Sequence, residues 1–177
     1  MNKKLIIGFS FVLLLEFWGH TNTEAVVCRT NVDSVLKASK DDATQVFNYK
    51  NKKILISDDD IYLMAQVVFA ESNAEPYQGK VAVASVILNR LLHPEFPNTV
   101  EDVIKQKGAF SCVKNGKLSV TPTEECFDAV YEALKGKDPT GAAVFFYNPR
   151  IATSKWMINV KKSNVKPIGN HIFFVVK

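Results

Sequence analysis

The sequence predicts an α+β fold, a mainly helical domain with a small antiparallel sheet. Two stretches of its 177 residues, 57–72 and 77–92, repeat apolar residues three and four positions apart, which is the spacing of one helix face. Capping residues and prolines mark where these and two further helices begin. Two continuous apolar runs near the C-terminus, 142–147 and 171–176, have the length of strands.

The first 25 residues have the pattern of an export signal. Lys3 and Lys4 precede an uncharged apolar run at 5–15, and Thr23 and Ala25 are small residues at the two positions that a signal peptidase recognises. The alternative is a retained membrane anchor, because acidic and aromatic residues follow the run. The run is short for a membrane-spanning helix. We therefore expect residues 1–25 to be a cleaved signal peptide. We expect the chain to contact the membrane only through this segment.

Residues 26–56 are predicted to be a linker or leader segment. They mix polar residues with scattered apolar positions, which favours at most one short helix at 31–40. Removal of the signal leaves 152 of the 177 residues, enough for one domain with a single core. We place the catalytic domain at residues 57–177.

The helix predicted at 57–72 carries the strongest candidate for a catalytic residue. Glu71 lies three residues beyond Val68 and seven beyond Met64, so a helix that continues this far places the carboxylate on the apolar face. A carboxylate on such a face is either paired with a base or kept protonated, and a protonated carboxyl group is a general acid. If the helix ends two residues earlier, Glu71 reaches solvent instead.

The helix boundaries follow from local signals. Ser57 with Asp60 forms a capping box for the first helix, and a proline opens the second at residue 76. Thr99 with Asp102 opens a short third helix that a glycine ends at residue 108. The run Thr-Pro-Thr-Glu at 121–124 opens a fourth helix.

A hairpin is predicted between the third and fourth helices. Asn115-Gly116 lies between short apolar runs at 109–113 and 117–120, and this arrangement is the strongest local hairpin signal. The two C-terminal apolar runs are predicted to pair as strands, joined by a loop that carries Trp156.

The composition narrows the possible partners. The formal net charge of +4 favours an anionic surface such as a bacterial wall and is too diffuse to indicate nucleic-acid binding. The sequence contains no cluster of His, Cys, Asp and Glu with metal-ligand spacing, so we expect no metal and no other cofactor. We expect a monomer.

Three cysteines, Cys28, Cys112 and Cys126, cannot all pair within one chain. Cys112 and Cys126 flank the predicted turn, so they either form a disulfide in an oxidising compartment or remain buried thiols. A Cys/His nucleophile is disfavoured, because neither His93 nor His171 lies in a motif of cysteine enzymes.

The segment around Glu71 resembles a known catalytic signature. Residues 67–84 read V-V-F-A-E-S-N-A-E-P-Y-Q-G-K-V-A-V-A and continue to Asn89-Arg90, as in the spore cortex-lytic enzymes, the SleB-type cell-wall hydrolases. Further motifs follow in the family's order: Phe110-Ser111, Asp138-Pro139-Thr140-Gly141-Ala142, Tyr147-Asn148-Pro149, Trp156, and Ile168-Gly169 before His171. Several ordered motifs are more specific than one, and the resemblance covers residues 61–177.

Two positions depart from the family's pattern. Ala109 stands where a glutamine often precedes Phe-Ser, and Asn170 replaces a glycine before the histidine. Both concern the sugar-binding subsites rather than the acid. The resemblance implies an architecture related to lysozymes and lytic transglycosylases, with a glycan cleft beside the small antiparallel sheet.

The resemblance implies an exported, wall-associated enzyme that cleaves peptidoglycan between N-acetylmuramic acid and N-acetylglucosamine. Its substrate would be either the spore cortex, during germination, or the vegetative wall. The family's catalytic glutamate falls on Glu71, which agrees with the carboxylate that the helix pattern indicates. The candidate substrate-binding residues are Phe110, Ser111, Tyr147, Asn148, Trp156 and His171.

The number of catalytic carboxyl groups decides the product. Glycoside hydrolases use two carboxyl groups about 5 to 10 Å apart, and Glu75 is the candidate for the second, although its place before Pro76 suits a helix N-cap equally well. With Glu71 alone, that residue protonates the leaving oxygen and then takes the proton of the attacking C6 hydroxyl, giving a 1,6-anhydro sugar by lytic transglycosylation. A function of another class is a wall-associated binding or accessory protein that keeps the cleft without turnover.

Overall fold

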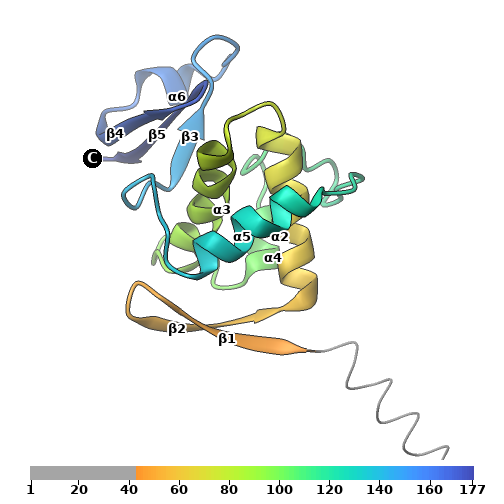
Figure 1. The fold of residues 1–177 in the computed structure, drawn as a ribbon. Coiled ribbons are helices and arrows are strands. Elements are labelled where there is room, and N and C mark those ends of the chain that lie inside the picture. Colours follow the sequence, from red (N-terminus) through yellow and green to blue (C-terminus); the bar gives the residue numbers. More distant parts are fainter. Residues whose placement is uncertain (1–42) are drawn as a thin grey trace, which may run out of the picture. The chain divides into compact units, whose positions relative to one another are not determined.

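The computed structural model describes residues 43–177. The predicted signal, residues 1–25, and the predicted leader up to residue 42 lie outside the described residues. None of the helices within 43–177 is long and apolar enough to cross a membrane. In chain order (Figure 1) the elements are β1 Thr44–Tyr49, β2 Lys52–Ser57, α2 Asp58–Ser72, α3 Tyr77–Leu91, α4 Val100–Lys105, α5 Glu124–Leu134, β3 Phe145–Tyr147, α6 Lys155–Asn159, β4 Lys162–Ile168 and β5 His171–Val176.

Helices α2, α3 and α5 pack against one another and supply most of the hydrophobic core. Every residue of α3 from Gly79 to Arg90 is buried, so this helix lies at the centre of the domain. Ala82, Ala84 and Ser85 are small buried residues of this helix, and small side chains let neighbouring helices approach closely.

The predicted helix starts are confirmed for α2 and α4 and differ for α5. Ser57 and Asp60 form the capping box of α2, and the Thr99 side chain caps α4. Helix α5 begins directly after Thr123, which makes no side-chain cap hydrogen bond. Thr121 stays outside the helix because a residue that precedes proline is disfavoured in the helical conformation.

The C-terminal sheet is antiparallel with the strand order β3-β5-β4. The predicted pairing of the two apolar runs is confirmed, since Phe145 pairs with Phe174 and Tyr147 with Ile172. The predicted loop around Trp156 was only partly right, because it contains helix α6 and strand β4. Strand β4 reads KSNVKPI and is mostly exposed, so it lacks the apolar pattern that indicates a strand.

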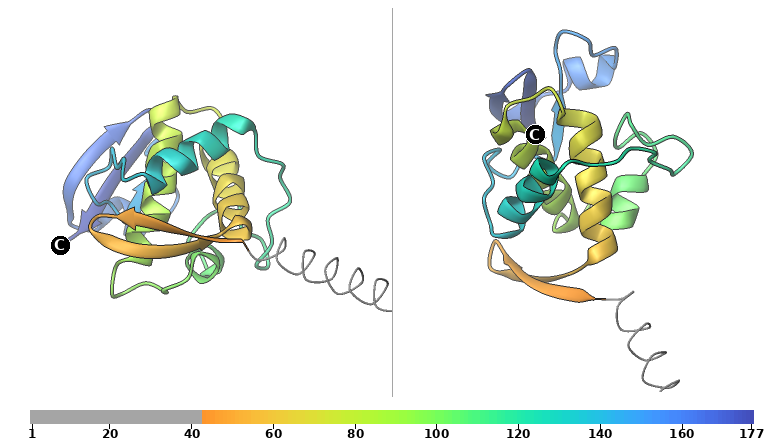
Figure 2. Two further views of the ribbon diagram at one scale, coloured as in Figure 1. Left: turned by 60° about the horizontal axis from the view of Figure 1, so that its bottom comes forward. Right: turned by 45° about the vertical axis from the view of Figure 1, so that its right-hand side comes forward.

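The structure also differs from the prediction at the end of the leader segment. Residues 44–57 form the β1–β2 hairpin rather than a linker. Tyr49, Ile54 and Ile56 of this hairpin are buried in the main core. In Figure 1 the hairpin lies below the helices and the three-stranded sheet lies above them, and the right-hand view of Figure 2 shows the same arrangement.

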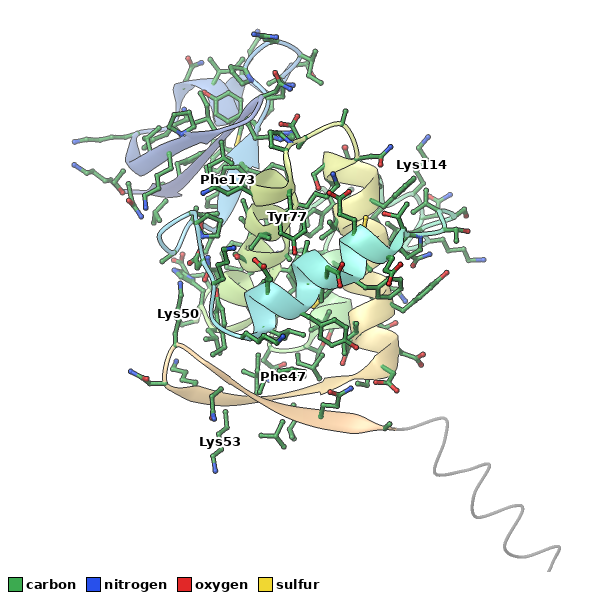
Figure 3. All side chains as sticks on the ribbon, viewed as in Figure 1. Phe47, Lys50, Lys53, Tyr77, Lys114 and Phe173 are labelled. Carbon is green, nitrogen blue, oxygen red and sulfur yellow. The ribbon has the colours of Figure 1, made fainter. Side chains whose placement is uncertain are left out.

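The turn of this hairpin explains why the sequence pattern missed it. Lys50 and Asn51 both have positive φ, 48° and 64°, in a turn that usually contains glycine. The outer face of the hairpin mixes polar residues with two exposed apolar ones, Val46 and Leu55. Phe47 points toward the helices while Lys53 points away from them (Figure 3).

A polar network fastens the hairpin to the end of α3. The Tyr49 hydroxyl donates to Asn89 Oδ1 at 2.8 Å, and Lys50 Nζ donates to the same oxygen at 2.7 Å. Lys50 also forms an ion pair with Asp138 at 2.6 Å. Asp138 in turn accepts hydrogen bonds from the backbone and hydroxyl of Thr140. The motif that begins at Asp138 therefore has a structural role.

The hairpin strands predicted at 109–113 and 117–120 are absent from the described structure. The turn itself forms, with positive φ at Asn115 and Gly116, but only an isolated bridge pairs the residues on either side. The backbone N–H groups of the first run have other partners, since Ala109 donates to the Gln106 carbonyl, Val113 donates to the Phe110 carbonyl and Cys112 donates to Glu71.

Candidate active site

Helix α2 continues through Glu71 and ends at Ser72, as the apolar repeat predicted. Ser72 is buried, whereas Glu71 is half-buried at the edge of the core. Its side chain lines a cavity of about 310 Å³. The prediction needs one correction, since the carboxylate faces a cavity beside the core rather than the core itself.

The Glu71 cavity is lined by residues of the helices and by residues of the C-terminal sheet. Its residues come from the end of α2, the segment after α4, strand β3, the segment before α6 and the start of β5. Six of the predicted site residues line it: Glu71, Phe110, Ser111, Tyr147, Asn148 and His171. Residues far apart in the sequence thus meet at one site.

A second cavity, of about 490 Å³, extends the first. The two share Gly108, Ala109, Phe146, Ser154 and Met157, so they form one groove. Trp156 lines the second cavity and is 52% exposed. Glu75 lines neither cavity.

One oxygen of the Glu71 carboxyl group is held by the protein. The Ser111 hydroxyl donates to Oε1 at 3.0 Å, and the Cys112 backbone N–H donates to the same atom at 3.1 Å. Both bonds end on Oε1, so Oε2 is the oxygen that these two donors leave free. Ser111 therefore contacts the acid, whereas the sequence suggested a contact with sugar.

The Cys112 side chain lies beside the same carboxylate. Burial, followed by the negative charge of Glu71, raises the pKa of the Cys112 thiol to about 12. The thiol therefore stays protonated near neutral pH and is a poor nucleophile. Cys112 and Cys126 are both free thiols, which resolves the two alternatives for this pair in favour of unpaired cysteines.

Arg90 is a functional candidate that the sequence analysis did not select. Its buried guanidinium donates from Nε to the Val144 carbonyl at 2.7 Å. The group lies over the rings of Phe96, Phe110 and Phe145, with its centre 4.9 to 5.8 Å from their centroids. The only available signal was its place in the motif Asn89-Arg90.

The charge of Arg90 is sensitive to Glu71. Burial lowers the pKa of Arg90 to about 10, and the negative charge of Glu71 opposes this effect. Arg90 remains a cation at neutral pH, so it is a positive charge near enough to Glu71 for the two groups to interact electrostatically. It also holds Phe110, which is 4% exposed, and this geometry favours packing over sugar stacking for that ring.

Glu75 binds the turn between β4 and β5. The Asn170 backbone N–H donates to Oε2 at 2.8 Å, and the Asn170 side chain donates from Nδ2 to Oε1 at 3.1 Å. Burial raises the pKa of Glu75, but these bonds, with the charges of His171 and Lys80, outweigh it and leave the pKa below its ordinary value. Glu75 is therefore ionised, and both of its oxygens are used in hydrogen bonds to Asn170, as expected for a structural carboxylate.

The sequence around this turn suits the contact. Gly169 has a φ of +59°, and a Cβ atom there would overlap Oε2 of Glu75. Asn170, one of the two departures from the family's pattern, adds the side-chain hydrogen bond to Glu75. Within the described residues, no group of three or more His, Cys, Asp or Glu side chains is arranged to hold a metal ion.

Comparison with known proteins places this chain in a family. The family described as Cell Wall Hydrolase matches residues 74–174. The spore cortex-lytic enzyme of Halalkalibacterium halodurans is 45% identical over 135 residues, which cover 76% of this chain and 40% of that protein. The spore cortex-lytic enzyme of Bacillus cereus is 50% identical over 117 residues, which cover 66% of this chain and 44% of that protein. The match thus spans less than half the length of these relatives.

Two solved structures are similar to this fold. The catalytic domain of the Bacillus cereus SleB protein is 47% identical, with a TM-score of 0.62, and the match covers 72% of this chain and 96% of that one. The catalytic domain of the germination-specific lytic transglycosylase SleB from Bacillus anthracis is 48% identical, with a TM-score of 0.62, and the match covers 67% of this chain and 96% of that one. From its sequence and its fold, the chain belongs to the cell wall hydrolase family.

Proposed function

We propose that this chain is exported and cleaves the glycan strand of peptidoglycan. The curated relatives are named spore cortex-lytic enzymes, which supports the spore cortex as substrate and germination as the occasion. The observation that carries the proposal is the Glu71 carboxyl group, held at one oxygen within a groove. The range matched by the family begins after Glu71. The proposed role of this residue is supported by the resemblance of its sequence motif and by its place in the groove.

Glu71 is the proposed general acid. Glu71 would act in its protonated form, and because Ser111 and the Cys112 N–H both bind Oε1, the proton of that form is on Oε2. That proton passes to the oxygen between N-acetylmuramic acid and N-acetylglucosamine as the bond to the anomeric carbon breaks. Positive charge develops at the anomeric carbon, and the newly ionised Glu71 stabilises it.

The groove favours lytic transglycosylation over hydrolysis. Among the described residues, Glu71 is the only carboxylate that lines its cavity. Both carboxylate oxygens of Glu75 accept hydrogen bonds from Asn170, and Glu95 lines only the second cavity. Because the Glu71 cavity contains no second carboxylate from residues 43–177 to activate water, Glu71 takes the proton of the C6 hydroxyl while that oxygen attacks the anomeric carbon. The acid regains its proton, and the product is a 1,6-anhydro sugar formed without water.

The remaining predicted residues are proposed to bind the sugar. Tyr147, Asn148 and His171 line the Glu71 cavity and supply hydrogen-bonding groups. Trp156 presents a half-exposed ring to the second cavity, packed edge-on against Phe145 at 5.3 Å between centroids. Such a ring is a suitable surface for stacking a sugar.

Product analysis tests this function. The purified protein is incubated with spore cortex sacculi, and the released muropeptides are identified by mass spectrometry. We expect 1,6-anhydro-muramic acid ends. Reducing muramic acid ends would instead indicate hydrolysis. Failure of a folded protein to release any fragment would contradict the enzymatic proposal and favour a wall-binding protein.

A further inference from the structure

His171 has an unusual environment at the start of β5. It is 9% exposed, and its Nδ1 is the only buried side-chain nitrogen or oxygen without a hydrogen-bond partner among residues 43–177. The closest charged group to this atom is Glu75, whose Oε1 lies 3.7 Å away. This distance is longer than a normal hydrogen bond, yet short enough for a strong electrostatic effect inside a protein.

The imidazole ring packs against a pair of stacked aromatic rings, Phe146 and Phe173, whose centroids are 5.4 Å apart. Phe146 packs edge-on against it at 5.3 Å between centroids, and Phe173 does so at 6.2 Å. His171 also lines the Glu71 cavity. Because the two ring nitrogens lie on opposite sides of an imidazole, a ring that directs Nδ1 toward Glu75 directs Nε2 away from it.

Glu75 is fixed as firmly as the ring. Both of its carboxylate oxygens accept hydrogen bonds from Asn170, and Lys80 Nζ donates to its backbone carbonyl at 3.1 Å. The glycine at position 169 leaves the space for this close approach. An ionised carboxylate at this place favours the imidazole tautomer that carries its proton on Nδ1.

We propose that Glu75 is a positioning residue that keeps the His171 proton on Nδ1, so that Nε2 accepts a hydrogen bond from a hydroxyl or amide group of the glycan bound in the Glu71 cavity. The choice of a glycan as ligand rests on the proposed function. Glu75 then contributes to the site through His171, which explains a buried carboxylate that touches no part of the groove.

The tautomer is measured directly by the nitrogen chemical shifts of the histidine rings in the ¹⁵N-labelled protein, at a pH where the rings are neutral. A His171→Gln variant assigns the signal of His171. His93 serves as an internal reference for the other tautomer. Its Nδ1 accepts a hydrogen bond from the Glu95 N–H, so its proton is on Nε2. We expect His171 to show its proton on Nδ1. The same tautomer as His93 would overturn the proposal.

Two variants separate the charge of Glu75 from its role in the turn. Glu75→Gln removes the charge, so the Nδ1 tautomer of His171 should lose its dominance. Asn170→Gly removes a donor to Glu75 but keeps the charge, so the tautomer should persist. Glu101→Gln changes an exposed carboxylate on α4 and should alter nothing. An unchanged His171 signal in folded Glu75→Gln would refute the proposal.

A titration with a peptide-free tetrasaccharide of alternating N-acetylglucosamine and N-acetylmuramic acid tests the acceptor role without any need for turnover. We expect the His171 Nε2 signal to shift on binding, and we expect Glu75→Gln and His171→Leu to bind about tenfold more weakly, as for the loss of one hydrogen bond. Movement of the Ser111 and Cys112 amide signals without any change at Nε2 would overturn the proposal. The proposed function fails separately, by the absence of cleavage.

Discussion

The Asp138→Asn substitution gives a stability prediction whose size follows from the structure. Burial raises the pKa of Asp138, but hydrogen bonds from Lys50, Thr140 and the Ala142 N–H outweigh it and lower the pKa from 3.8 to about 2. A carboxyl group with a lowered folded-state pKa stabilises the protein above its unfolded-state pKa, and this contribution is lost as the pH falls through the folded-state value. The shift corresponds to about 2 kcal/mol near neutral pH.

Urea unfolding of the wild type and of Asp138→Asn at two pH values tests this prediction. Near neutral pH we expect the variant to lose about 2 kcal/mol of unfolding free energy, and near pH 3 we expect the difference to shrink to roughly half. Asp128→Asn is the matched control, because Asp128 is exposed on α5 and its loss should cost less than about 0.5 kcal/mol. An equal loss of unfolding free energy at both pH values, or no loss at all, would refute the hydrogen-bond network around Asp138.

Three further substitutions test individual contacts. Ser111→Ala removes the hydroxyl that binds Glu71, so kcat for muropeptide release should fall about tenfold with little change in KM, and an unchanged kcat would argue against this contact. Trp156→Ala should raise KM about fivefold without changing the thermal unfolding temperature, since this ring is half-exposed, and a normal KM would exclude it from substrate binding. Gly169→Ala places a Cβ against Glu75 at a positive φ, so it should lower the unfolding free energy by about 2 kcal/mol, and a fully stable variant would contradict the close approach.

Local signals in the sequence predicted the helices and two of the C-terminal strands. Apolar residues at helical spacing and capping residues such as Ser57 and Thr99 act within one turn of the chain, so a single sequence reveals them. The N-terminal hairpin was missed because its turn uses Lys50 and Asn51 at positive φ instead of glycine. Its outer face mixes polar residues with exposed Val46 and Leu55, so the apolar residues do not mark one buried face. The burial of Tyr49 depends on Asn89, a residue far away in the sequence.

The site shows the same division between local and tertiary information. Helical spacing predicted that Glu71 lies on the inner side of α2, and the family resemblance selected five further residues that line its cavity. Neither could predict that Ser111 and Cys112 hold one oxygen of the acid, because this contact joins segments that are 40 residues apart. Arg90 and the Glu75–His171 contact were missed for the same reason.

The predicted likeness to lysozymes and lytic transglycosylases stays a prediction, as does a monomeric state. The two solved structures that resemble this chain in both sequence and fold are SleB catalytic domains. A cleaved signal peptide is proposed from the N-terminal sequence pattern alone.

The most direct test of the account is the rate at which Glu71→Gln releases muropeptides from cortex sacculi, compared with the wild type. Glutamine keeps an oxygen that can accept the hydrogen bonds of Ser111 and Cys112 but has no acidic proton to deliver. We predict that release falls by at least about 100-fold while the thermal unfolding temperature stays the same. A variant that cleaves the glycan at nearly the normal rate would contradict the role of Glu71 as the acid.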